Sequence, residues 1–95
     1  MFSIKYHPEV KTSDLPKLDA REKSKIKKAI EQRLIQAPDR YGTPLQRTLK
    51  GYWKLRVGDH RIVFRIRGSV VHILAIIHRK DVYRLVERRL AEEVD

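Results

Sequence analysis

The sequence predicts a single small α+β domain over residues 1–95. A four-stranded sheet, antiparallel apart from one mixed edge, is covered by N-terminal helices and by a C-terminal helix. Three observations predict this fold class. Apolar and polar residues alternate in three segments within 52–83. Two glycine-led pairs, Gly58-Asp59 and Gly68-Ser69, separate these segments. Stretches with helical periodicity precede and follow them, and 95 residues suffice for one modest core.

The first glycine-led pair sets the register of the first hairpin. Gly58 at the first central position is typical of a type II′ turn, which joins two strands with no further residues. Pairing outward from this turn places Trp53 opposite Phe64 on one face and Arg56 opposite Arg61 on the other. We therefore expect the first face to join the core and the second to carry the charged side chains.

The second pair extends the sheet by the same reasoning. It places Arg65 opposite His72 and Arg61 opposite Ile76. His78 lies two residues beyond Ile76, so this register predicts that His78 shares the face and the sheet end of Arg61. Like charges directly opposite one another are unfavourable, which favours an anion site at this end. The alternative is an ordinary solvated face whose long side chains spread into water.

The N-terminal third supplies an edge strand and two helical segments. Residues 2–6 alternate as a strand that ends before Pro8, and residues 9–18 are typical of a short helix or helical turn. Asp19 followed three residues later by Glu22 is a capping-box pattern. It opens a helix over residues 20–36, whose sheet-facing residues are Ile26, Ala29, Ile30 and Leu34.

The remaining segments complete the fold. Residues 45–49 alternate in a way that favours an extended approach to the first strand of the hairpin. Asp81 is placed to cap a final helix. The apolar stripe of that helix comprises Val82, Leu85, Val86 and Leu90.

The charge distribution indicates the class of partner. The net charge is +10, and residues 41–80 hold nine basic residues against one acid, Asp59. A basic surface of this kind on a small domain favours nucleic acid or an acidic protein as partner. There is no cysteine, no apolar run of membrane-spanning length and no signal-peptide pattern. We therefore expect an unexported cytoplasmic protein that does not associate with membranes.

The residue types restrict the chemistry of the basic face. The four histidines do not fall at metal-ligand spacing, and no glycine-rich phosphate loop is present, so we expect neither a metal nor another cofactor. Cations together with a tyrosine fit phosphodiester cleavage in RNA. In that reaction the ribose 2′-hydroxyl is the nucleophile, the cations stabilise charge on the phosphate, and a positioned group takes the proton.

Two blocks of the sequence, LKGYWKLRVGDHRIVFRI and HRKDVYR, resemble the RelE/ParE superfamily of toxins from toxin–antitoxin pairs. The order of expected elements extends this resemblance over nearly the whole chain, and the second block favours the RelE branch. The chain departs from the RelE pattern at Tyr52, where a second lysine is expected. The resemblance implies the catalytic residues Lys54, Arg61, Arg79 and Tyr83, and the substrate-binding residues Lys50, Arg56 and His78.

The resemblance also implies a role for each of these residues. Arg61 would hold the scissile phosphate, Lys54 would stabilise charge or take a proton, Arg79 would act near the leaving group, and Tyr83 would be the general base. Arg56 would contact a further phosphate, and His78 is an alternative acid or base because histidine titrates near neutral pH.

The implied function is that of a ribosome-dependent mRNA endoribonuclease that inhibits translation. Its partners would be mRNA on the ribosome and an acidic RelB-like antitoxin, which would join it in a hetero-oligomer. Two alternatives stay open. One is a ParE-like inhibitor of DNA gyrase without hydrolytic activity, and the other is a weakly active co-repressor with the RelE fold.

Overall fold

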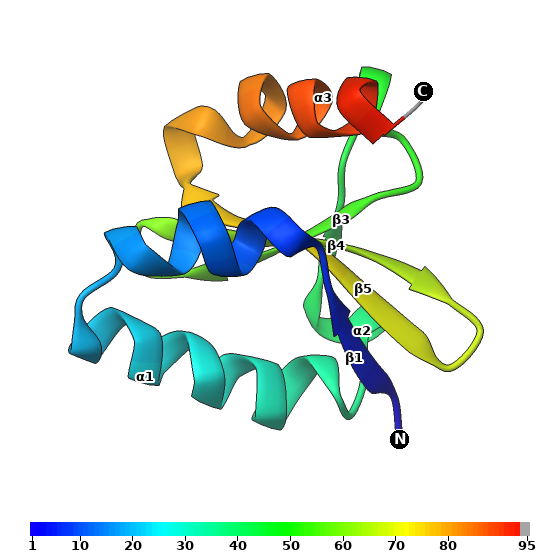
Figure 1. Cartoon of the computed structure of the whole chain (residues 1–95). Helices are drawn as coiled ribbons and strands as arrows, with labels where there is room; N and C mark the ends of the chain where they lie inside the picture. The colour runs from blue at the N-terminus through cyan, green and yellow to red at the C-terminus, as the bar shows by residue number, and fades with distance from the viewer. Residues whose placement is uncertain (94–95) are drawn as a thin grey trace.

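The computed structural model describes residues 1–93 and confirms the predicted α+β architecture (Figure 1). The sheet contains five strands in the order β1-β5-β4-β3-β2. The strand β1 is parallel to β5, and the other neighbours are antiparallel. The fifth strand, beyond the four expected, contains only two residues. The strands are β1 (Ser3–Tyr6), β2 (Thr43–Pro44), β3 (Trp53–Val57), β4 (His60–Arg67) and β5 (Val70–His78).

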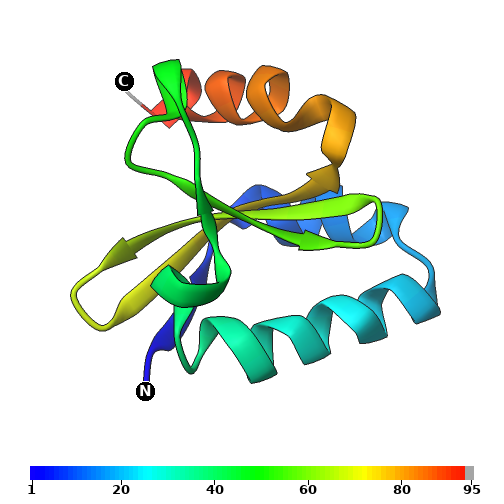
Figure 2. The same cartoon turned by 180° about the vertical axis from the view of Figure 1, so that it is seen from behind.

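Helices cover both faces of this sheet. Figures 1 and 2 show α1 (Ala20–Ala29) on one side and α3 (Val82–Glu93) on the other, while α2 (Pro38–Tyr41) leads into β2. The shorter helical segments are η1 (Val10–Asp14), η2 (Leu15–Lys17), η3 (Ile30–Leu34), η4 (Arg47–Leu49) and η5 (Arg79–Asp81). We refer to the two sheet surfaces as the α1 face and the α3 face. None of the helices within residues 1–93 is both long and apolar enough to cross a bilayer.

The start of α1 confirms the predicted capping box. The Asp19 carboxylate accepts a hydrogen bond from the Glu22 amide at 2.8 Å, and Glu22 accepts one from the Asp19 amide at 3.0 Å. These bonds satisfy amides that a helix start leaves unpaired. The helix then continues through η3, so that the predicted helix over 20–36 is one rod with a wider last turn.

Both hairpin turns have the predicted type II′ geometry. Gly58 has φ of 60° and Gly68 has φ of 57°, whereas neither Asp59 nor Ser69 has a positive φ. A positive φ at the first central residue alone distinguishes type II′ from type I′. The first hairpin pairs as predicted, including Trp53 with Phe64 and Arg56 with Arg61.

The second hairpin follows the predicted register only as far as a bulge. Arg65 pairs with His72, as expected, but the register shifts between Val63 and Phe64. Beyond this point Arg61 pairs with Ile77, so the predicted pairing with Ile76 is wrong. One extra residue on one strand moves every later side chain of that strand to the opposite face.

Two apolar clusters hold the helices to the sheet. On the α1 face, Leu55, Ile62 and Phe64 of the sheet pack against Ile26 and Ile30. On the α3 face, the stripe of α3 packs on the sheet and on the segment before β3. This second cluster contains Leu45, Leu49, Val63, Ala75, Ile77, Val82 and Val86.

The segment 45–49 differs from its prediction. Instead of an extended approach it forms the 3₁₀ turn η4, with the Leu45 and Leu49 side chains buried beneath α3. A 3₁₀ turn repeats every three residues, so it does not preserve the strand alternation that the sequence resembles. Arg47, at the start of this turn, adopts φ of 55°.

The strand β5 extends beyond the edge strand beside it. Tyr6 at the end of β1 pairs with Ile73, whereas β5 continues to His78. Two backbone groups of this extension bond to side chains. Asp14 accepts a hydrogen bond from the Ile76 amide at 2.9 Å. Arg89 donates one to the Leu74 carbonyl at 2.9 Å.

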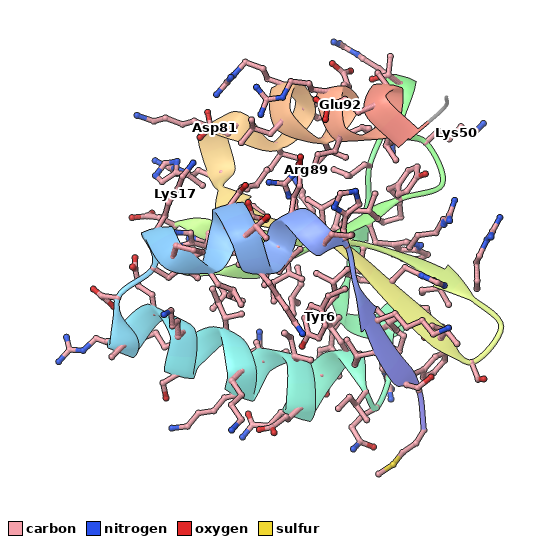
Figure 3. The ribbon with its side chains drawn as sticks, in the orientation of Figure 1. Tyr6, Lys17, Lys50, Asp81, Arg89 and Glu92 are labelled. Carbon is pink, nitrogen blue, oxygen red and sulfur yellow. The ribbon has the colours of Figure 1, made fainter. Side chains whose placement is uncertain are left out.

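Arg89 and Asp14 also form a buried ion pair, with 3% of each residue exposed. Two guanidinium nitrogens of Arg89 bond to the two carboxylate oxygens of Asp14, and a third bonds to Glu9 at 2.7 Å. Figure 3 shows Arg89 between α3 and the N-terminal helical segment. The pair therefore joins α3, η1 and the extended edge of β5.

Candidate functional site

Three of the predicted site residues share the α3 face of the sheet. Lys54 pairs with Val63, which lies in the cluster beneath α3, and Arg56 pairs with Arg61 two residues further along. Alternation in β3 therefore puts Lys54 and Arg56 on the same face as Arg61. Arg56 is exposed, while Lys54 and Arg61 are half-buried.

The guanidinium of Arg61 is held by its own turn. Its Nη1 donates hydrogen bonds to the carbonyls of Gly58 at 3.0 Å and His60 at 2.9 Å. Burial lowers the pKa of Arg61, and the charges of Arg56 and Arg79 lower it further, against a smaller opposing effect of Asp59. The side chain nevertheless remains a cation at neutral pH, because guanidinium groups do not lose their proton in proteins. An anion bound here would relieve the repulsion among the three guanidinium groups.

A backbone bond brings Arg79 to this cluster. The Arg79 amide donates to the carbonyl of Asp59 at 2.9 Å, which fastens the start of η5 to the turn between β3 and β4. The charge of Arg79 also lowers the pKa of Arg61, so we group Arg79 with the residues on the sheet. We call Lys54, Arg56, Arg61 and Arg79 the basic cluster.

Tyr83 lies in the first turn of α3, four residues after Arg79. Its hydroxyl oxygen accepts a hydrogen bond from the Gln46 amide at 3.1 Å, and the side chain is 38% exposed. Gln46 follows β2, which pairs with β3 at Lys54. The Tyr83 hydroxyl is thus held at the β2–β3 edge of the sheet. Because its oxygen is the acceptor in this hydrogen bond, its own proton does not take part in it.

His78 does not join the basic cluster, so the prediction that it shares the face of Arg61 is wrong. Beyond the bulge, His78 pairs with His60. The centres of the two rings lie 6.2 Å apart, in an edge-to-face arrangement. His60 in turn lies 3.7 Å from Glu22 of α1, which places both rings on the α1 face. His78 Nδ1 accepts a hydrogen bond from the Lys80 amide at 3.2 Å and thereby caps η5.

Lys50 is also separate from the basic cluster. Figure 3 places it beside the C-terminal end of α3, whereas Asp81, next to the cluster, lies at the other end. Lys50 is exposed and follows η4. Of the seven predicted site residues, the structure therefore brings together Lys54, Arg56, Arg61 and Arg79, with Tyr83 one helical turn beyond Arg79.

The position that departs from the RelE pattern has an unpredicted neighbour. Arg65 donates to the Tyr52 hydroxyl at 3.3 Å, and its guanidinium carbon lies 5.5 Å from the centre of the Tyr52 ring. The Arg65 guanidinium therefore supplies a cation beside Tyr52, although it comes from β4 and not from the position of the expected lysine. The first hairpin register alone, extended by one residue beyond Trp53 and Phe64, would have found this pair.

The arrangement can bind a phosphate by several guanidinium groups and can offer a tyrosine and a lysine for proton transfer. Guanidinium groups bind phosphate oxygens with paired, charge-assisted hydrogen bonds. Within residues 1–93, no three or more histidine, aspartate or glutamate side chains gather as they would around a metal ion. The donor set at the basic cluster therefore suits an oxyanion.

Comparison of the sequence with protein families gives a match over residues 4–83 to the ParE toxin of the type II toxin–antitoxin system parDE. Toxin RelG of Mycobacterium tuberculosis is 42% identical to this chain over 53 residues. That match covers 54% of this chain and 61% of the length of RelG.

Solved structures share the fold. The toxin–antitoxin complex RelBE2 of M. tuberculosis contains a chain that is 30% identical, with a TM-score of 0.75 over 82% of this chain and 98% of that one. The RelB–RelE complex of Methanococcus jannaschii matches at 20% identity, covering 84% of this chain and 95% of its own, with a TM-score of 0.65. The chain belongs to the RelE/ParE family of toxins of type II toxin–antitoxin systems.

Proposed function

We propose that this toxin is a ribosome-dependent mRNA endoribonuclease that arrests translation in the cytoplasm. The observation that carries the proposal is the basic cluster, in which Lys54, Arg56 and Arg61 share one face. Arg79 acts on Arg61 electrostatically, and Tyr83 follows Arg79 by four residues. A surface that only binds a partner does not require a tyrosine hydroxyl held in place at the β2–β3 edge of the sheet.

In the proposed reaction the ribose 2′-hydroxyl attacks the adjacent phosphate, and the bond to the 5′-oxygen of the next nucleotide breaks. Arg61 and Arg56 bind the non-bridging oxygens, where negative charge increases in the transition state. Tyr83 or Lys54, in its deprotonated form, takes the proton of the 2′-hydroxyl. Arg79 stabilises the departing 5′-oxygen, which takes a proton from water. The products are a 2′,3′-cyclic phosphate and a free 5′-hydroxyl.

The proposal is tested by mapping mRNA cuts on programmed ribosomes by primer extension. The wild-type toxin should produce cuts at fixed positions within codons, and Tyr83→Phe should lower their rate by roughly 10²-fold or more, because it removes the proton-accepting oxygen. Tyr41→Phe is a matched control, since Tyr41 is also exposed, at 50%, but lies in α2. The absence of cuts by the wild-type toxin would refute the proposal.

We further propose that an acidic antitoxin binds in a groove beside β1 and forms a hetero-oligomer with the toxin. A cavity of about 530 Å³ lies between β1, η1 and α1, and its apolar lining includes Ile4, Leu15, Ile26, Ile30 and Ile35. Three lysines, Lys11, Lys23 and Lys27, also line it, and Figure 3 shows Tyr6 in this region. Apolar contacts with acidic flanks would suit this groove. Two of the related toxins were crystallised with antitoxins.

This partner is tested by co-purification of the toxin with the acidic protein encoded beside it. Lys23→Glu would place a like charge against the acidic partner at the groove. Lys28→Glu makes the same change of charge on the exposed side of α1 and serves as the control. We expect the first variant to lose the complex and the second to retain it.

The match to the ParE family favours one second candidate, inhibition of DNA gyrase without hydrolysis. A supercoiling assay with purified gyrase separates this gyrase inhibitor from the proposed nuclease. Inhibition of supercoiling that survives Tyr83→Phe, together with uncut mRNA, would establish the gyrase function. The third possibility, a weakly active co-repressor, predicts operator binding by the toxin–antitoxin complex without growth arrest by the free toxin.

A further inference from the structure

Four side chains form a row across the α3 face, at the end of the sheet away from the basic cluster. Lys5 of β1 pairs with His72 of β5, and His72 pairs with Arg65 of β4. Tyr52, just before β3, completes the row through its hydrogen bond with Arg65. We call Lys5, His72, Arg65 and Tyr52 the cross-strand row.

Lys5 and Arg65 flank His72 with positive charges, which disfavour its protonation. Like charges directly opposite each other on neighbouring strands are unfavourable. Burial lowers the pKa of His72, and the charges of Arg65, Lys5 and Arg67 lower it further. All the charged groups that act on His72 within residues 1–93 are thus cations. The row has the electrostatics of an anion site.

The guanidinium of Arg65 is only partly satisfied by the protein. One nitrogen bonds to Tyr52, but Nε is buried and has no hydrogen-bond partner within residues 1–93. Buried polar atoms without partners are rare, so each indicates a missing interaction. The Tyr52 ring supports the guanidinium plane at 5.5 Å and fixes where its donors lie.

A cavity adjoins this unsatisfied donor. Its volume is about 150 Å³, and its lining includes Tyr52, Arg65, His72 and Leu90. This volume equals that of about five water molecules, which is enough for an oxyanion of the size of a phosphate group.

We propose that the cross-strand row is a second anion site, which binds a backbone phosphate of the RNA strand. This assignment rests on the proposed nuclease function. Arg61 and Arg65 lie on the same face of β4, four residues apart, so that about 13 Å separates their Cα atoms. Val63 lies between them on this face beneath α3, so a bound RNA strand would reach the row beside the C-terminal end of α3, where Leu90 lines the cavity. The second contact would fix the register of the strand over the site of cleavage.

The first test measures anion binding by the whole toxin without ribosomes. Inorganic phosphate and acetate are titrated separately at constant ionic strength, while the Nε–Hε signal of Arg65 and the ring signals of His72 are followed by NMR. Arg65→Lys assigns the arginine signal by removing it. We expect a saturable response to phosphate and a weaker one to acetate. No response would overturn the site, and a stronger response to acetate would assign it to the carboxylates of a protein partner.

The second test uses a 2′-O-methyl RNA oligonucleotide, which the proposed chemistry cannot cut. Arg65→Gln should weaken its binding by about tenfold, as expected for loss of a charged hydrogen bond. The slope of log affinity against log salt should fall by about 0.7. Arg67 is exposed and lies two residues further along the same face of β4. Arg67→Gln removes the same charge, and it should weaken binding by about twofold or less.

The outcomes separate this proposal from the proposed function. Equal losses in the Arg65 and Arg67 variants would overturn the site, because net charge alone would then explain binding. Failure of the wild-type toxin to bind the oligonucleotide would overturn the RNA assignment. A phosphate response at Arg65 with oligonucleotide binding but no cleavage of mRNA would support the row and refute the nuclease.

Discussion

Arg61, for which we propose phosphate binding, is oriented by bonds within the protein. Its two bonds to carbonyls of the β3–β4 turn restrict the guanidinium, and the same turn binds the amide of Arg79. A donor already oriented toward the place where charge increases requires little reorganisation during the reaction. The type II′ turn thereby sets the relative position of the two arginines.

Arg61→Gln should lower the rate of mRNA cleavage by roughly 10²–10³-fold, the usual cost of removing one oriented donor to a transition state. His78→Gln should change the rate by about threefold or less, because His78 lies on the α1 face. Single-turnover cleavage on programmed ribosomes measures both rates. Equal losses in the two variants would contradict this division of the faces.

His72 should make stability depend on pH. Its folded pKa is lowered by burial and by neighbouring cations, so the unfolded chain binds the proton more readily than the folded one. The free energy of unfolding should therefore fall as the pH drops below about 6.5 and level off below the folded pKa. Urea unfolding between pH 8 and pH 5 measures this, and His72→Gln should reduce the decline. A titration midpoint of the His72 ring above 6.5 in phosphate-free buffer would contradict it.

Among the structural elements, α3 depends most on a polar anchor. Its apolar stripe packs on the sheet, but its third turn is held by the ion pair between Arg89 and Asp14. Removal of one partner leaves an unpaired buried charge, whereas replacement of both can be nearly neutral. The hydrogen bond with Asp14 also raises the pKa of Arg89, which keeps the guanidinium charged.

Arg89→Met should therefore lower the free energy of unfolding by roughly 3–5 kcal/mol. Arg88→Met is the matched control, because Arg88 is exposed and its pair with Glu92 spans 3.8 Å, so its loss should cost less than about 1 kcal/mol. The double variant Arg89→Met/Asp14→Leu should recover part of the loss. Urea denaturation followed by circular dichroism gives all three values. Additive losses in the double variant would show that the two residues do not act as a pair.

The elements also show what the sequence could and could not predict. The capping box at Asp19, the two type II′ turns and the first hairpin register depend on neighbouring residues, and all are confirmed. The bulge between the second pair of strands has no local signal, because Leu74 continues an apolar run. Because of this single inserted residue, His78 lies on the face opposite to the predicted one. The ion pair of Arg89 escaped prediction because its partner is 75 residues away.

At the scale of the whole molecule, the net charge of +10 is distributed over both faces. The basic cluster and the cross-strand row lie on the α3 face, while exposed lysines of α1 cover the opposite side of the molecule. This distribution attracts polyanions over long distances and also opposes the compact state through self-repulsion.

Salt should therefore stabilise the folded toxin. Raising sodium chloride from about 0.01 M to about 0.1 M shortens the Debye length from about 30 Å to about 10 Å and screens repulsion across the molecule. We expect the melting temperature to rise over this range. Phosphate should raise it further than chloride at equal ionic strength, because bound anions stabilise the folded state. Equal effects of the two salts would argue against specific anion sites on the folded protein.

The long separation between Arg89 and Asp14 also has a consequence for synthesis. Contacts between distant residues form late in folding, and a chain on the ribosome cannot form them before both residues have emerged. The meander of β3, β4 and β5 can close earlier, because its partners are near neighbours in the sequence. Tyr83 lies on the helix that this last contact fastens. The helix that carries Tyr83 would thus be fastened only after Arg89 has emerged from the ribosome.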